Sequence, residues 1–557
     1  MTVKNEDGWS VKETISKAFT RKADFGDDKD ALLDVIYWGR QIISLLVGVV
    51  FGLIPLKGLI AILLYVAIST FVGHFYVTSF QEQDEEALGG FMELNVFFLM
   101  YSSIVYLLPL LFTHALCQQT QIAALLITQQ WPYELEHARK FEEQSVKELT
   151  ALEVNHVIFK THADFEKYIG AWGIWSILKK LSDRSQNASW ILIAEPYTQV
   201  DWTKLLELTN TLNADEEHFL GRALYDKEPV IIHHYHGFQN SEKRLYYPDF
   251  AGGVLLSRGA LKRISNAAPT HDKSDFTIDA KFEFAKFIND NTGIELKNVP
   301  EFCLLANETN CITKYEEPTY STDELGCGDG ISKEQVFYAV KTYSGFHKSR
   351  IVIVKRTWAH QTKFIEYFSD TVDVQVPTID LKVPNAEQGH CAKTIAILKY
   401  FLKNEEFKHI NWIVVADDDS LLNVDRLHKI INCLPTRMIL GERYGFGFEY
   451  DGVGGYDYPT GGSGFVMSRE TARFIAYSCG DCSPVDLDDM HIGRCARRLN
   501  IPILHSSAFH QAQRRAYNPL YIQRIQPISF HKFEDLDPYK EYLDYLKTPN
   551  KPVHTEL

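Results

Sequence analysis

The chain has 557 residues, enough for three or four domains of ordinary size. Its composition, 45% hydrophobic, 13% aromatic and 23% charged, is that of a folded protein and excludes a collagen-like, coiled-coil or mainly disordered chain. The net charge of −15 argues against unspecific binding to nucleic acid, because neutralising phosphates requires a surplus of Lys and Arg. We therefore expect no nucleic-acid partner.

Three long apolar runs lie near the start of the chain, at residues 41–56, 59–80 and 94–116. The second is long enough to cross a bilayer, and the first becomes so when residues 35–38 are included. Seven of the eight Lys and Arg residues before residue 92 precede the first run, which places the N-terminus in the cytoplasm. Residues 1–91 are thus predicted as a cytoplasmic N-terminus with two transmembrane helices.

The third run, within residues 92–117, has two interpretations. It is either a third transmembrane helix or a signal peptide, because it ends in the small-residue pattern Ala115-Leu116-Cys117. Both place the rest of the chain in a lumen. In the first case that part is anchored in the membrane, and in the second it is soluble.

Features after Cys117 suit the endoplasmic reticulum. Eight of the nine cysteines lie there, and an even number favours disulfides of undetermined connectivity. Cys479 and Cys482 form a CxxC pair, for which a redox pair or half a zinc site is the less favoured interpretation. Asn187 and Asn307 begin glycosylation sequons. Residues 554–557, HTEL, resemble an ER-retrieval tetrapeptide.

Two parts of the chain repeat each other. The segment beginning WILIAEPY at Trp190 matches the segment beginning WIVVADDD at Trp412, and YPDFAGGVLLSR from Tyr247 matches YPTGGSGFVMSR from Tyr458. Each apolar run starting with Trp reads as a buried strand, followed by a helical pattern. The repeat predicts two tandem α/β domains with largely parallel sheets, at residues 118–325 and 326–553.

The two copies differ at the end of that strand, where α/β sheets bind their ligands. The second has Asp417, Asp418 and Asp419, whose mutual repulsion favours a bound Mg²⁺ or Mn²⁺. A solvated turn that caps a helix is the alternative that this motif alone leaves open. The first copy has Glu195-Pro196-Tyr197 instead, so we expect residues 118–325 to be non-catalytic.

Residues 25–94 carry the elements DVIYWGRQ, PLKG and DEEALGG. They resemble a small family of membrane proteins, the Rab5-interacting proteins, which are related to a small subunit of the ER membrane protein complex. The resemblance implies a non-enzymatic membrane factor that acts in insertion, folding or assembly. The sequence leaves open whether this segment and the rest form one natural protein or two joined genes.

Residues 330–545 carry five ordered elements, VKRTW, WIVVADDD, YPTGGSGFVMS, DDMHIG and SFH. They resemble the Fringe-like family of inverting β-1,3-glycosyltransferases. FHQA, PISFHKF and the retrieval-like tail are most similar to its members that add glucose to O-linked fucose on thrombospondin type 1 repeats. The resemblance implies glycosyltransferase-A-like domains, the first degenerate, with UDP-glucose as donor and fucosylated thrombospondin type 1 repeat proteins as partners.

Two alternatives stay open. The donor is UDP-galactose or UDP-N-acetylglucosamine on the same fold, or the protein is a non-enzymatic ER membrane assembly or quality-control factor. The overall expectation is a multi-domain protein in which an N-terminal helical transmembrane segment precedes the two α/β domains.

The Fringe-like resemblance also implies roles for single residues. Asp417 and Asp419 would hold Mn²⁺ or Mg²⁺ together with His531, or with His510 as second choice. Asp489 would be the general base that deprotonates the acceptor hydroxyl. Donor or substrate binding is expected of Arg356, Trp358, Asp418, Gly461, Gly462 and Gly464.

Overall fold

The computed structural model describes residues 11–25, 29–53, 59–83, 122–165, 174–185, 188–226, 245–267, 276–384, 389–448, 454–483 and 485–548. The chain divides into two compact units, Met1–Gln119 and Thr120–Leu557. The third apolar run, the Asn187 sequon position and the C-terminal tetrapeptide lie outside the described residues.

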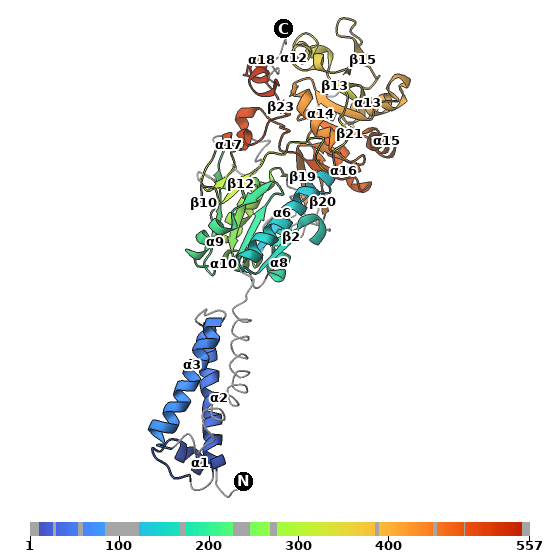
Figure 1. Ribbon diagram of the computed structural model, residues 1–557. Coiled ribbons are helices and arrows are strands. Elements are labelled where there is room, and N and C mark those ends of the chain that lie inside the picture. The colour runs from blue at the N-terminus through green and yellow to red at the C-terminus, as the bar shows by residue number, and fades with distance from the viewer. Residues whose placement is uncertain are drawn as a thin grey trace, which may run out of the picture. The chain divides into compact units, whose positions relative to one another are not determined.

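Helices make up the described part of the first unit. They are α1 (Val11–Ala18), α2 (Lys29–Leu53), α3 (Leu59–Phe75) and the π-helical turn η1 (Tyr76–Phe80), coloured blue in Figure 1. Several large apolar side chains of α2 and α3 are exposed, among them Trp38, Leu46 and Phe71. In the part of the chain that the structure describes, no helix has both the length and the hydropathy of a membrane crossing. The expected transmembrane helices are not confirmed and stay predictions.

The first half of the second unit is built on a six-stranded sheet of order β10-β5-β8-β3-β1-β2. Only β8 runs antiparallel to its neighbours. Its strands are β1 (Ile122–Leu126), β2 (His156–Lys160), β3 (Trp190–Ala194), β5 (Phe219–Gly221), β8 (Val254–Ser257) and β10 (Lys297–Asn298). Its main helices are α6 (Pro132–Ala151), α8 (Ile174–Arg184), α9 (Trp202–Asn210), α10 (Arg258–Ser265) and α11 (Ala280–Thr292).

The second half has a seven-stranded sheet of order β15-β14-β13-β16-β21-β18-β22, in which only β21 is antiparallel to its neighbours. The strands are β13 (Val336–Lys341), β14 (Phe364–Ser369), β15 (Thr378–Asp380), β16 (Trp412–Asp417), β18 (Ile439–Gly441), β21 (Phe465–Ser468) and β22 (Ile503–His505). The main helices are α12 (Arg350–Thr357), α13 (Cys391–Lys403), α14 (Val424–Asn432), α15 (Arg469–Ser478) and α16 (Asp488–Arg498).

Alternation along the strands explains the two layers of helices. On β16, Ile413 and Val415 pack into one apolar cluster with α13, α15 and α16. Val414 and Ala416 point to the opposite face and pack into a second cluster with α12 and α14. A strand with both faces covered reads as a continuous apolar run, as this one does.

The two halves repeat each other in topology and register, which confirms the internal repeat. Trp190 of β3 pairs with Ser257 of β8, and Trp412 of β16 pairs with Ser468 of β21. Both serines then accept a hydrogen bond that caps the following helix, α10 or α15. The small sheets repeat as well: β4 (Thr198–Val200) pairs with β12 (Thr313–Tyr315) as β17 (Ser420–Leu422) pairs with β23 (Ser529–His531).

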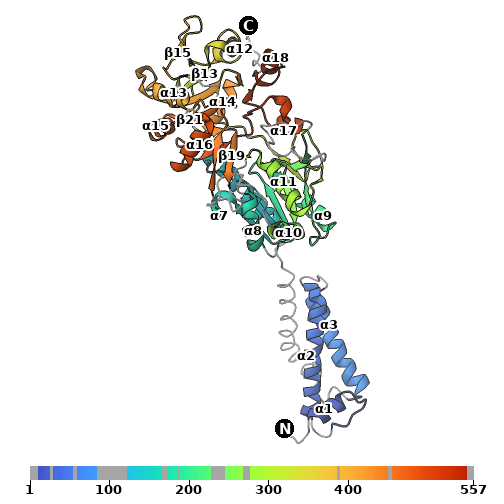
Figure 2. The same ribbon diagram turned by 180° about the vertical axis from the view of Figure 1, so that it is seen from behind.

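The halves form one compact unit rather than two separate bodies, and Figures 1 and 2 show them packed side by side. β9 (Phe276–Thr277) of the first half pairs with β19 (Arg443–Phe448) of the second. The Trp131 indole N–H donates to the Cys433 carbonyl at 2.6 Å. The Arg524 guanidinium donates to Asp249 at 2.8 Å, and both side chains are almost completely buried.

All eight cysteines after Cys117 form disulfides, which confirms the expectation drawn from their even number. The pairs are Cys303–Cys311, Cys327–Cys433, Cys391–Cys482 and Cys479–Cys495.

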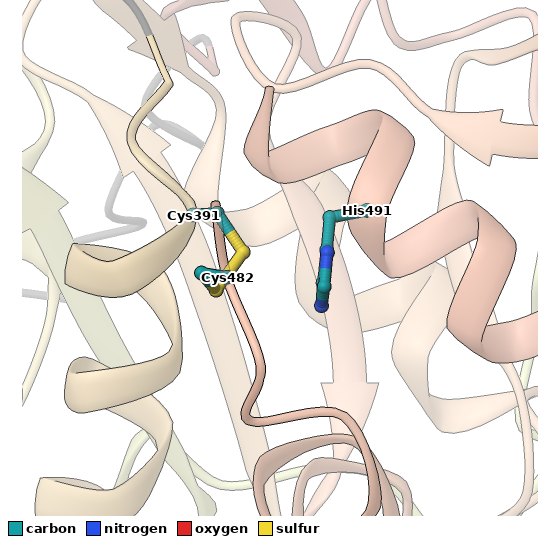
Figure 3. A group of neighbouring side chains, drawn as sticks. All are labelled: Cys391, Cys482 and His491. Carbon is teal, nitrogen blue, oxygen red and sulfur yellow. A yellow bond between two sulfur atoms is a disulfide. The ribbon is translucent and has the colours of Figure 1, made fainter. Parts of the chain in front are cut away.

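The interpretation of Cys479 and Cys482 as a redox pair or half a zinc site is therefore wrong, because each is bonded to a different cysteine. Figure 3 shows His491 beside the Cys391–Cys482 bond. That trio resembles a metal site only in its spacing, since sulfurs joined in a disulfide are not the thiolates that a metal ion binds.

The buried ion pair between the halves yields the first prediction. Replacing Arg524 by Met leaves the Asp249 charge buried without its partner, so the free energy of unfolding should fall by about 3–5 kcal/mol. Urea denaturation followed by tryptophan fluorescence measures it. Arg515→Met is the control, because Arg515 forms an exposed 3.8 Å pair with Asp535 and should change stability by less than about 0.5 kcal/mol. Equal stability of the two variants would contradict the prediction.

Candidate active site

An acidic cluster lies at the carboxyl end of the central strand β16. The strand ends at Asp417, and the chain then turns through Asp418 and Asp419 into β17. Because Ser420 of β17 pairs with His531 of β23, this histidine is brought beside the turn. One ligand atom each of Asp417, Asp419 and His531 lies within 4.8 Å of the other two. The structure thus brings together the three residues expected to hold a metal ion.

His531 is held in an orientation that suits a metal ligand. Its Nδ1 lies 2.8 Å from the Gln511 carbonyl, and its Nε2 lies 3.1 Å from Asp419 Oδ1. Burial lowers the pKa of His531, but the hydrogen bond to Asp419, the charges of Asp419 and Asp417 and the Gln511 carbonyl together raise this pKa above its ordinary value. When Nδ1–H donates to a carbonyl, the neutral ring directs the Nε2 lone pair toward the acidic oxygens. Two carboxylates and such an imidazole are suitable ligands for Mn²⁺.

Two cations that the sequence analysis missed offset the charge of this cluster. Lys341 Nζ, at the end of β13, lies 2.9 Å from Asp417 and 2.6 Å from Asp488. Arg350 Nη1, at the start of α12, lies 2.8 Å from Asp419 and 3.2 Å from Asp418. The rule that ligands bind at strand ends could have identified Lys341, which closes the apolar run VFYAVK. No comparable signal marks Arg350.

Two neighbouring carboxylates at the start of α16 have opposite electrostatic environments. Asp488 is buried, but Lys341 outweighs the effect of burial and lowers the pKa of Asp488 to about 2; Thr394 also donates to it at 2.7 Å. Asp489 accepts from the Gly461 N–H at 3.2 Å, and burial together with the Asp488 charge raises the pKa of Asp489 to about 7. One carboxylate is thus ionised and the other titrates near neutrality, a division typical of acid–base sites.

The glycines between β20 (Gly454–Pro459) and β21 lie close to both groups of side chains. A Cβ added to Gly462 would lie 2.2 Å from His531 Nδ1, whereas one added to Gly461 would have its nearest neighbours, Asp488 and Asp489, at 3.7 and 3.8 Å. Gly464 has a φ of +74°, which a side chain would strain. Only glycine lets this loop approach His531 so closely.

Two expectations, those for His510 and Trp358, need correction. His510 is fully buried, with its Nδ1 2.9 Å from the Ser529 carbonyl and its ring stacked on Phe530, so it is not part of the metal-ligand cluster. Trp358 is fully buried and donates its indole N–H to the Ser420 carbonyl at 3.0 Å. It supports β17 and cannot contact a substrate.

Of the other expected residues, Arg356 and Asn307 are exposed, and Asp418 is buried. Arg356 is exposed on α12, and it is Arg350 on the same helix whose guanidinium reaches the acidic cluster. Asp418 is buried and accepts from the Thr342 hydroxyl at 2.6 Å; burial raises the pKa of Asp418 to about 6. Asn307 is exposed on the loop closed by the Cys303–Cys311 disulfide.

The corresponding place in the first half lacks this ligand set. Glu195, Pro196 and Tyr197 follow β3 there. Tyr315 pairs with Thr198 as His531 pairs with Ser420, so a phenol stands at the register position of the imidazole. Of the three ligand positions, only one keeps a carboxylate.

Comparisons with known proteins agree with this division of the chain. Residues 331–554 match the Fringe-like family model, and residues 35–112 match the EMC6 family model. The chain is similar to the β-1,3-glucosyltransferase of Mus musculus, with 41% identity over 396 residues, 70% of this chain and 79% of the relative. The Homo sapiens β-1,3-glucosyltransferase is 42% identical over 386 residues, 68% of this chain and 76% of the relative. GEL complex subunit OPTI of Mus musculus is 42% identical over 86 residues, 15% of this chain and 67% of the relative.

The glycine loop yields a prediction about metal affinity. In Gly462→Ala the new methyl group would overlap the His531 ring, which is hydrogen-bonded and cannot move freely. Mn²⁺ affinity, measured by isothermal titration calorimetry, should fall about 10- to 100-fold. In the matched control, Gly461→Ala, the methyl group makes only ordinary contacts, so affinity should be unchanged. Equal Mn²⁺ affinity in both variants would show that the loop does not position His531 for a metal ion.

Proposed function

Because this chain belongs to the β-1,3-glucosyltransferase family, we propose that it transfers glucose from UDP-glucose to O-linked fucose on thrombospondin type 1 repeats. It is a glycosyltransferase, and the donor and acceptor are the proposed part. The observation that carries the proposal is the cluster of Asp417, Asp419 and His531, with Asp489 close by and titrating near neutrality.

The acidic cluster fits a divalent cation of the size and hardness of Mn²⁺ or Mg²⁺. Asp417, Asp419 and His531 would hold the ion, which when bound neutralises charge on the departing diphosphate. Lys341 and Arg350 keep Asp417 and Asp419 in place through direct ion pairs. They also offset the repulsion between the carboxylates and so leave the cluster preformed before a donor arrives.

Asp489 would act as the general base. Its carboxylate takes the proton from the acceptor hydroxyl while that oxygen forms a bond to the anomeric carbon and the bond from this carbon to the diphosphate breaks. A single displacement inverts the anomeric configuration, so no covalent intermediate on the protein is required. The Gly461 N–H orients the carboxylate, and Lys341 keeps the adjacent Asp488 ionised.

The first half would be a non-catalytic relative of the second. It keeps the strand order and register, but Tyr197 and Tyr315 stand where Asp419 and His531 stand in the second half. Phenols and a single carboxylate make a poor site for a hard divalent cation. This loss supports one catalytic centre in the chain.

We also propose that the first unit associates with the ER membrane and that the second unit lies in the lumen. Support comes from the similarity to OPTI and EMC6, from the exposed apolar side chains of α2 and α3 and from the four disulfides of the second unit.

A donor panel tests the proposed substrates. The full-length protein with Mn²⁺ and an O-fucosylated thrombospondin type 1 repeat should use UDP-glucose in preference to UDP-galactose or UDP-N-acetylglucosamine, by roughly tenfold or more in kcat/KM. Mass spectrometry of the repeat measures the added hexose. Preference for either other donor would reassign the sugar, and no transfer from any donor would overturn the proposal.

A variant and a pH profile test the role of Asp489. Asp489→Asn should lower kcat about 10²- to 10⁴-fold, whereas Asp481→Asn on the exposed loop should leave it unchanged. A base must be ionised to act, so wild-type kcat/KM should rise with pH and level off above about pH 7, where Asp489 titrates. A rate that falls across this range, or equal rates in the two variants, would rule out Asp489 as the base.

A further inference from the structure

A cavity of about 100 Å³ lies between the two halves of the second unit. In the first half it is lined by Glu195 and Tyr197 after β3, by Tyr315 of β12 and by Lys281 at the start of α11. The repeat matches these positions to the strand ends and helix start that hold Asp417, Asp419, His531 and Asp488. The cavity therefore occupies the place in the first half that the candidate active site occupies in the second.

Arg524, from the second half, supplies a fixed positive charge at this cavity. Its guanidinium is paired with Asp249 and lies over the rings of Tyr315 and Tyr521, at 4.8 and 4.9 Å from their centroids. The ion pair and the contacts with the two rings fix the position of this buried guanidinium without any bound ligand. Acidic groups in this region thus have a resident cation and need no metal ion.

The charges around the cavity balance, which favours a neutral occupant. Burial raises the pKa of Glu134 to about 7 and that of Glu442 to about 8, so both are largely uncharged below neutral pH. The remaining acidic groups are Glu195, whose pKa burial also raises, Asp249 and Asp279, and the basic groups are Lys281, Arg443 and Arg524. Neither sign of charge is in large excess, so a charged ligand would gain little from the lining.

Several polar atoms around the cavity have unused hydrogen-bonding capacity. Among the described residues, the Tyr444 hydroxyl, the Tyr197 hydroxyl and Arg443 Nε are buried and have no hydrogen-bond partner. The side chains of Tyr444 and Arg443 are only 5% and 7% exposed. Buried polar atoms are nearly always hydrogen-bonded in proteins, to protein groups or to ordered water. The cavity lining also includes aromatic rings, among them Trp131 and Tyr320.

We propose that this cavity binds a neutral polyhydroxylated ligand the size of one monosaccharide unit. Hydroxyl groups of such a ligand accept from Arg443 and Tyr444 and donate to Glu195, and the apolar faces of its ring pack against the aromatic side chains. The cavity has room for several water molecules, which a sugar ring would replace. The proposal rests on the cavity alone and does not depend on the donor, acceptor or metal ion proposed above.

Binding of methyl glycosides to the full-length protein tests this. With EDTA present and no UDP-sugar, a panel of methyl α- and β-glycosides of glucose, galactose and fucose is titrated by saturation-transfer NMR. At least one should bind saturably, and Asp417→Asn should bind it as the wild type does. Tyr444→Phe should weaken binding about tenfold, while Tyr477→Phe, at an exposed position on α15, should not change it.

Stability separates loss of a ligand contact from loss of the fold. Because the Tyr444 hydroxyl has no partner in the protein, Tyr444→Phe should melt no lower than the wild type. No saturable binding by any glycoside would overturn the proposal and leave a water-filled cavity. Binding that Tyr444→Phe does not weaken, or that Asp417→Asn abolishes, would overturn it as well, because the ligand would then occupy a different place.

Discussion

The concentration of negative charge at one edge of the second sheet is the constraint on which this site depends. Asp417, Asp418, Asp419, Asp488 and Asp489 come from one strand end and one helix start, and like charges this close cannot all ionise without counter-charges. The pairing of neighbouring strands supplies these counter-charges. Because β13 runs parallel to β16, Lys341 stands beside Asp417, and because β17 pairs with β23, His531 stands beside Asp419. Arg350 completes the set from α12. The residual negative charge is what makes the cluster receptive to a divalent cation.

The two halves share one fold but balance the charge at their equivalent strand ends in different ways. In the second half the ligand positions are polar, and Gly462 leaves space for His531. In the first half the equivalent positions hold tyrosines, and the buried charge is balanced by Arg524 from the other half. The first half also stabilises the second, because one apolar cluster and one strand pairing extend across both halves. The residues at the equivalent positions of the first half pack in the interior and line a cavity.

Much of this could be predicted from sequence, because it depends on local patterns. Apolar runs beginning with Trp190 and Trp412 identified equivalent strands, and the even number of cysteines identified disulfides. The Asp417, Asp419 and His531 cluster followed from the family resemblance. The predictions that were wrong concern residues whose surroundings are set by tertiary contacts. Cys479 and Cys482 are near each other in sequence but bond to partners elsewhere, and Trp358 lies in the VKRTW element yet faces the core. Arg350 carries no local mark, because only the packing of α12 against β17 brings it to the carboxylates.

We propose that His531 completes a metal site with Asp417 and Asp419. Pulsed EPR of the full-length protein loaded with Mn²⁺ and UDP tests it most directly, since nitrogen bound to manganese produces a ¹⁴N hyperfine coupling. We expect one imidazole coupling in the wild type and its loss in His531→Gln, which should still bind Mn²⁺ but more weakly. A coupling that persists in His531→Gln, or no nitrogen coupling in the wild type, would contradict it.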